Sequence, residues 1–104
     1  MIDPANPERG EASLVVAGQM RVLRPTFSAL VAAEEELGPL FALVERASEG
    51  QLRLAEIAGL FWHCCEGRET LPREAMGEAV LAMGLAGASA PLRELLKQIL
   101  QGRT

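Results

Sequence analysis

The stretch LAEIAGLFWHCCE, residues 54–66, sets the organisation expected for the rest of the chain. At about 100° per residue it predicts a helix whose apolar side chains cover an arc of roughly 200°. A helix on the surface of a small domain usually carries an apolar stripe of about 100° or somewhat more. The sequence therefore predicts a central helix with more apolar surface than one neighbour covers. The excess either lies inside a bundle or binds another protein.

The chain has 104 residues, which predicts a single domain over residues 1–104. Hydrophobic residues make up 49% of the sequence and aromatic residues only 4%, so we expect a folded core built mainly from Leu, Ala, Val, Ile and Met. Two adjacent cysteines do not suggest a disulfide framework. A reducing, cytoplasmic location fits this cysteine usage best.

The formal net charge of −4 argues against nucleic-acid binding, because contacts to a phosphate backbone need clustered cations. The polar, proline-containing start of the chain does not resemble a signal peptide. No run approaches the roughly 20 apolar residues that span a bilayer, so we expect no membrane partner.

Residues 1–9 contain two prolines and few apolar groups, and we expect them to form a flexible lead-in. Apolar and polar residues then alternate over residues 11–16 and 19–24, with Ala17-Gly18 between them. This pattern predicts a β-hairpin over residues 11–24. A lone hairpin is only marginally stable in water, so the hairpin is expected to pack on the helices that follow.

Thr26 is predicted to cap a first helix that ends at Gly38, and Pro39 to open a second helix that ends near Ser48. Near the end of the first helix, residues 34–36 are three consecutive glutamates. Carboxylates oppose the helix dipole there, which favours a cationic partner for one of them.

The central helix is predicted to end at Gly67. Thr70 is expected to cap a fourth helix containing Met76 and Met83, and Ser89 to cap a last helix that contains Pro91 near its start. The predicted fold is mainly α within the α+β class. It consists of an N-terminal β-hairpin packed on a bundle of four to five short helices over residues 26–101.

The only cluster of metal-type side chains is His63-Cys64-Cys65, and neighbouring side chains on a helix diverge by about 100°, so they do not converge on one ion. We expect buried structural thiols and a solvated His63 on the polar side. Consecutive glutamates do not face each other either, which favours a solvated face or one ion pair over acid–base catalysis. The sequence thus predicts no catalytic residue, no metal and no cofactor.

The segments around residues 6–11, the hairpin turn, residues 23–30 and residues 34–38 resemble the small tail assembly chaperone family of prophages and gene transfer agents. Members of this family are also labelled tail tube proteins. The likeness spans roughly residues 6–67 and departs at Ala17, where Asp-Gly is the more usual turn. The positions that carry it are Arg9, Gly10, Glu11, Gly18, Thr26, Leu30, Glu34 and Gly38.

This resemblance implies a non-enzymatic helper that binds the apolar, helical tape measure protein and helps to recruit the tail tube protein. An apolar helix face suits an amphipathic partner helix. The expected contact residues are Leu60, Phe61 and Trp62, with Met76 and Met83 as an adaptable wall; the more common role of such residues is ordinary core. Trp62 is expected to be the most exposed of them. A second copy of the chain is another possible cover for the spare apolar surface.

Three other functions compete with the chaperone. A structural component of the tail or virion is the first alternative. A small regulatory or nucleic-acid-binding helical module is the second, and the acidic charge counts against it. An enzyme is the least favoured class, because no nucleophile is paired with a base.

Overall fold

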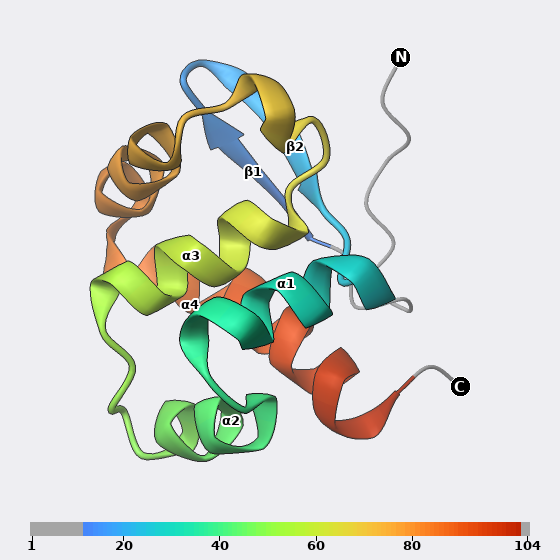
Figure 1. Cartoon of the computed structure of the whole chain (residues 1–104). Helices are drawn as coiled ribbons and strands as arrows, with labels where there is room; N and C mark the ends of the chain where they lie inside the picture. The colour runs from blue at the N-terminus through green and yellow to red at the C-terminus, as the bar shows by residue number, and fades with distance from the viewer. Residues whose placement is uncertain (1–11, 103–104) are drawn as a thin grey trace.

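A computed structural model of the protein describes residues 12–102. Figure 1 shows α3 in the middle of the molecule, with the hairpin on one side and α1 and α2 on the other. The predicted class, mainly helical α+β with an N-terminal hairpin, is confirmed. The elements, in chain order, are β1 (Ala12–Val16), β2 (Gln19–Leu23), α1 (Phe27–Leu37), α2 (Leu40–Ser48), α3 (Leu54–Cys64), the 3-10 helix η2 (Arg68–Thr70) and α4 (Arg73–Gln101).

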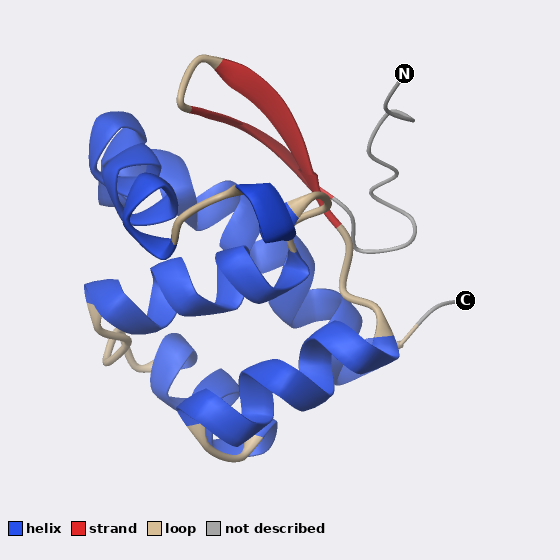
Figure 2. Ribbon diagram, turned by 45° about the horizontal axis from the view of Figure 1, so that its top comes forward, coloured by secondary structure: helices blue, strands red, loops and turns tan. Residues whose placement is uncertain are grey.

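The two strands form an antiparallel hairpin at one end of the molecule (Figure 2). Ala17 and Gly18 link them with φ angles of 51° and 79°. Positive φ at both central residues is the geometry of a type I′ turn, whose twist matches that of the strands. Leu14 and Val16 are buried, whereas Val15 lies on the opposite face and is exposed. The predicted hairpin is confirmed, apart from residue 11, which lies outside the described residues.

The first two helices begin and end close to the predicted positions. The Thr26 hydroxyl accepts a hydrogen bond from the Ala29 N–H at 3.2 Å, which satisfies one of the free donors at the start of α1. Gly38 follows the last helical residue of α1. Two residues later α2 begins, with Pro39 before its first turn.

The central helix is shorter than predicted. It ends at Cys64 rather than near Gly67, because the next residues pair with the hairpin. Cys65 forms an antiparallel bridge with Leu23, and the Glu66 N–H donates to the Val22 carbonyl at 2.9 Å. These hydrogen bonds attach the hairpin to the end of α3, which is how the marginal two-stranded sheet is held on the helices.

The predicted fourth and last helices join into α4, which is kinked at Gly84 (φ 79°, ψ 158°). A positive φ of this kind favours glycine, so the break falls at Gly84 rather than at Ser89. Both predicted caps are wrong. Thr70 belongs to η2, and Ser89 lies inside the helix with its hydroxyl donating to the Ala86 carbonyl. By length and composition α4 as a whole is apolar enough to cross a membrane, but the kink divides it into residues 73–83 and 85–101.

Buried side chains from the hairpin and all four helices meet in one apolar cluster. The largest of them, among those with less than 2% of their surface exposed, are Phe61, Leu23, Leu43, Leu60, Met76 and Leu95. Each helix thus contributes to the core, and α3 and α4 contribute the most. The apolar side chains that lie outside this core are the ones available to a partner.

Candidate partner-binding groove

Most of the predicted contact residues lie in the core. Leu60, Phe61 and Met76 are completely buried, so they are not available to a partner in this structure. The prediction failed because α3 is enclosed from several sides: α1 and α4 pack along it and the hairpin closes its end. Most of the wide apolar arc of the central helix is therefore covered from within the chain, and Leu54 at the start of α3 remains 40% exposed.

Trp62 and Met83 are partly buried and pack against the same cluster. The Trp62 indole N–H donates to the Leu71 carbonyl at 2.8 Å, and the Arg73 guanidinium lies 4.6 Å from the ring centroid. These contacts make Trp62 a bridge between α3 and the start of α4. A Trp62→Glu substitution is accordingly expected to destabilise the fold, and it does not serve as a clean probe of binding.

Met83 lines a shallow hollow of about 410 Å³ between the hairpin and α4. Val15 and Leu14 contribute from β1, and Ala79 and Pro91 lie on α4. Of the five predicted contact residues, Met83 alone lines one of the hollows described here.

Glu36 joins three elements through one carboxylate. Arg73 donates two hydrogen bonds to it, each 2.7 Å long, and the His63 Nε2–H donates a third, also 2.7 Å. The Arg73 hydrogen bonds, followed by the His63 hydrogen bond, lower the pKa of Glu36 from 4.5 to about 2. With Trp62 these residues form what we call the Glu36 cluster: Glu36, Trp62, His63 and Arg73.

The Glu36 cluster confirms that one of the three glutamates has a cationic partner. It corrects the prediction for His63, which is 8% exposed rather than solvated. The reason is that α1 and α4 close over the side of α3 that the sequence pattern marks as polar, and they supply a carboxylate and an arginine there.

Both cysteines are buried, as predicted. Burial raises the pKa of the Cys64 thiol to about 12 and also raises the pKa of Cys65. A protonated thiol is a poor nucleophile and a poor metal ligand. Within residues 12–102, no group of three or more His, Cys, Asp or Glu side chains is placed to hold a metal ion.

The family-motif residues that the structure describes have structural roles. Gly18 forms the hairpin turn, Thr26 caps α1 and Gly38 ends it. Leu30 packs on the core, and the Glu34 carboxylate accepts a hydrogen bond from the Leu40 N–H at 3.0 Å, which ties α1 to α2. Arg9, Gly10 and Glu11 lie outside the described residues.

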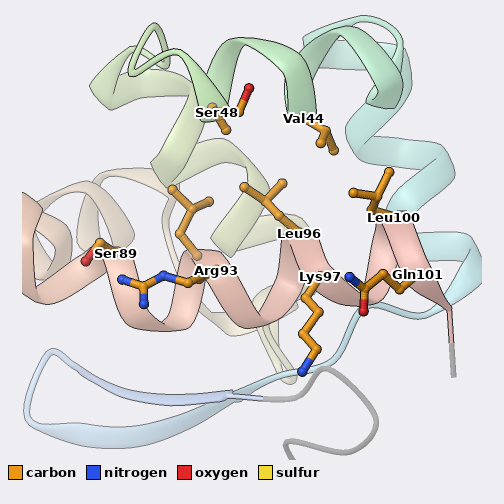
Figure 3. Close-up of a pocket in the computed structure, with 10 residues that line it drawn as sticks. Val44, Ser48, Ser89, Arg93, Leu96, Lys97, Leu100 and Gln101 are labelled. Atoms are coloured by element: carbon orange, nitrogen blue, oxygen red, sulfur yellow. The ribbon is translucent and has the colours of Figure 1, made fainter. Parts of the chain in front are cut away.

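An apolar hollow lies between α2 and the second part of α4. It has a volume of about 460 Å³, and Figure 3 shows Leu96 and Leu100 pointing from α4 towards α2, with Val44 on the opposite wall. The lining residues are Val44, Ala47, Ser48, Ser89, Leu92, Arg93, Leu96, Lys97, Leu100 and Gln101.

A second hollow of about 370 Å³ adjoins the first, since Val44 and Leu100 line both. It is lined by Glu34, Pro39, Leu40, Phe41, Val44, Ile99 and Leu100. We call the two hollows together the α2–α4 groove. Phe41 is 74% exposed and Leu100 56% exposed, so large apolar side chains at this groove are open to a partner.

The groove has a structural cause. Only Leu43 of α2 is fully buried, and an ion pair in which Arg46 binds Glu56 at 2.6 and 2.8 Å links the helix to α3. Sequence reasoning found both apolar stripes but not the gap between them. The one feature of the sequence that indicated the groove is Phe41, which makes the apolar stripe of α2 wider than one packing partner covers.

Comparison with known proteins gives one informative result. The family model described as "Phage tail tube protein, GTA-gp10" matches residues 9–102, which is most of the chain. No curated protein and no solved structure gives a significant match. The match agrees with the resemblance in the N-terminal half and extends it through α4. The chain therefore belongs to the phage tail protein family described as tail tube protein GTA-gp10.

Proposed function

We propose that this protein is a tail assembly chaperone that binds the tape measure protein in the α2–α4 groove and assists tail tube assembly in the host cytoplasm. The observation that carries the proposal is the groove itself: an open, apolar channel between two helices in a member of a tail protein family. Amphipathic helices dock in such channels by inserting one apolar face.

The exposed apolar side chains support this proposal. Phe41 and Leu100 flank the channel, and Leu92 and Leu96 form its floor. A large aromatic side chain beside a hydrophobic channel is a common anchor of binding energy. A tape measure protein with long apolar helices has a matching face. A chaperone that covers this face before tube assembly keeps the tape measure protein soluble.

The chemistry of the polar side chains supports a non-enzymatic role. His63 is buried and bonded to Glu36, so it is not available as a base for a substrate. The raised pKa of each thiol keeps both cysteines protonated at neutral pH. No charge relay of the kind that activates a nucleophile follows from these contacts.

A structural tail component is the second candidate, and the wording of the family description favours it. The two roles differ in where the protein is found. A chaperone is present in producing cells and absent from purified particles. A tube component is present in purified particles in many copies, and quantitative mass spectrometry of both fractions separates the two.

The binding experiment is co-expression with the full-length tape measure protein, followed by affinity purification. Phe41→Glu and Leu100→Glu place a charge in the groove and are expected to reduce recovery of the tape measure protein by roughly tenfold or more. Phe27→Glu is the matched control, because Phe27 is 86% exposed and lies on α1, outside the groove.

The circular dichroism spectrum and the unfolding midpoint of each variant are measured alongside. If the wild type does not recover the tape measure protein, or if Phe27→Glu is as damaging as Phe41→Glu, the proposal is wrong. Loss of binding with an unchanged fold, limited to the two groove variants, is the supporting result.

A further inference from the structure

We propose that the α2–α4 groove selects a helix whose apolar stripe is edged by acidic residues, with those residues lying towards the Ser89–Lys97 end. This inference rests on the proposed function and specifies the chemistry of the segment bound. It follows from two cations on the rim of the groove and from one carboxylate at the other end.

Arg93 and Lys97 line the first hollow, four residues apart on α4. Figure 3 shows Arg93 lying along α4 near Ser89, and Lys97 extending from α4 away from α2. Like charges at this spacing repel each other on a helix. The neighbours four residues away, Ser89 and Gln101, are uncharged, and Glu94, three residues before Lys97, forms no ion pair with it within residues 12–102.

Three other arginines of the described chain have anionic partners, whereas Arg21, Arg53 and Arg68 form no ion pair within residues 12–102. Arg24 pairs with Glu66, Arg46 with Glu56 and Arg73 with Glu36. Within residues 12–102, no such ion pair involves Arg93 or Lys97. In a chain whose formal net charge is −4, two neighbouring cations that line an apolar channel form a positively charged rim that an acidic partner complements.

The opposite end of the groove has the opposite sign. Glu34 lines the second hollow together with Phe41, and its carboxylate already accepts the Leu40 N–H. An acidic residue of a partner is repelled there and attracted near Arg93 and Lys97. The two ends therefore give the channel a direction, and the bound helix is expected to lie with its acidic end beside the cations.

Rim charges mainly affect the rate of association and its dependence on salt, whereas the apolar floor supplies most of the affinity. Each exposed charge pair contributes modestly, so loss of two such pairs corresponds to a reduction in affinity of roughly 3- to 30-fold. That effect is small enough to require purified components and a direct measurement.

The experiment uses fluorescein-labelled synthetic helical peptides of about 20 residues as probes, since shorter isolated helices are marginal in water. Two peptides share one leucine stripe and differ only at one end, which carries glutamates in the first peptide and lysines in the second. Fluorescence anisotropy gives the affinity of the full chain for each peptide at several salt concentrations.

The test variant is the double substitution Arg93→Gln and Lys97→Gln. Its matched control is Gln19→Glu with Gln51→Glu, because both pairs of substitutions lower the net charge by two and both control positions are exposed and outside the groove. We expect the glutamate peptide to bind the wild type more tightly than the lysine peptide does. In the test variant its affinity falls roughly 3- to 30-fold with a flatter salt dependence, and in the control it does not.

Three results overturn the inference: equal binding of the two peptides, an unchanged affinity in the Arg93/Lys97 variant, or an equal loss in the control. A fourth is a dimer in sedimentation equilibrium that the Arg93/Lys97 variant converts to monomer, because the groove is then occupied by a second copy of the chain.

The outcome is separable from that of the proposed function. If the tape measure protein is recovered by the wild type and lost in Phe41→Glu, but the two peptides bind equally, the chaperone role stands and the charge selectivity is wrong. If the tape measure protein is never recovered but the peptides bind as expected, the charge selectivity stands and the proposed partner is wrong.

Discussion

The Glu36 cluster and the α2–α4 groove show two ways in which helices of one small protein meet. At the Glu36 cluster, between α1, α3 and α4, one carboxylate accepts hydrogen bonds from an arginine and a histidine, and the arginine lies over an indole ring. At the groove, leucines of α4 face α2 across open space, and two cations remain unpaired within the described residues.

This difference separates stability from binding. Where the charged groups are already paired and the apolar groups are mostly buried, little surface remains for a partner. At the groove, Phe41 and Leu100 are exposed to solvent, so burying these side chains against a partner is favourable. Substitutions in the first region are therefore expected to change the free energy of unfolding, and substitutions in the second to change binding.

The largest effect is expected from the same substitution made once in the apolar core and once at the groove. Phe61→Ala, in the core, is expected to lower the free energy of unfolding by about 3–5 kcal/mol, because it removes a fully buried ring and leaves a cavity. Phe41→Ala, at the groove, is expected to change it by less than about 0.5 kcal/mol. Urea denaturation monitored by circular dichroism measures the free energy of unfolding of both variants. An equal loss in the two would show that the core and the groove do not differ in their contribution to stability.

Trp62→Phe tests whether the indole connects α3 to α4. It keeps an aromatic ring near Arg73 but removes the N–H that donates to the Leu71 carbonyl. We expect a loss of about 1–3 kcal/mol in the free energy of unfolding, because a partly buried carbonyl is left without its donor. An unchanged urea midpoint would show that water replaces the indole at no cost.

Glu36→Gln tests the charge of the Glu36 cluster. Since folding lowers the pKa of Glu36 from 4.5 to about 2, the ionised carboxylate stabilises the fold fully above pH 4.5, and this contribution is lost as the pH falls towards 2. The carboxylate is 40% exposed and screened by solvent, so we expect a difference of only about 1 kcal/mol from the wild type at pH 7, shrinking in acid.

The measurement is urea denaturation of the wild type and the variant at pH 7, 4 and 2.5. Glu35→Gln is the matched control, because Glu35 is the exposed neighbour on α1 and makes no ion pair within residues 12–102. A gap between wild type and Glu36→Gln that stays constant over this range would mean that the cluster does not depend on ionisation.

The smallest effect is expected at the hairpin turn. Ala17 has a φ of 51°, a conformation that asparagine adopts more readily than alanine at this position of a type I′ turn. Ala17→Asn is expected to raise the free energy of unfolding by about 0.5–1 kcal/mol. Ala17→Val, with a branched side chain at the same φ, is expected to lower it, and both are read from thermal or urea midpoints.

The sequence predicted the local structure of the first half of the described chain well. Thr26 and Gly38 bound α1 as expected, and the alternation around Ala17-Gly18 gave the correct hairpin. These features depend on a few neighbouring residues, because caps and tight turns close hydrogen bonds within four positions. The resemblance in the same region pointed to the family that the match over residues 9–102 establishes.

The sequence was less informative where distant elements compete for the same residues. Cys65 leaves the helix because the backbone of β2 lies beside it, and His63 is buried because Glu36 and Arg73 converge on it. The kink falls at Gly84, several residues before the expected cap at Ser89. Each of these outcomes needs the position of a segment far away in the chain.

The amino-acid sequence by itself determined that the chain is mainly helical, where α1 and the hairpin lie, and that there is more apolar helix than one contact uses. Only the tertiary structure decided which apolar faces are satisfied. It buried Leu60, Phe61 and Met76 and left Phe41 and Leu100 beside a groove. The physical reason is that helical periodicity fixes which side chains share a face, whereas burial depends on how closely another helix approaches that face.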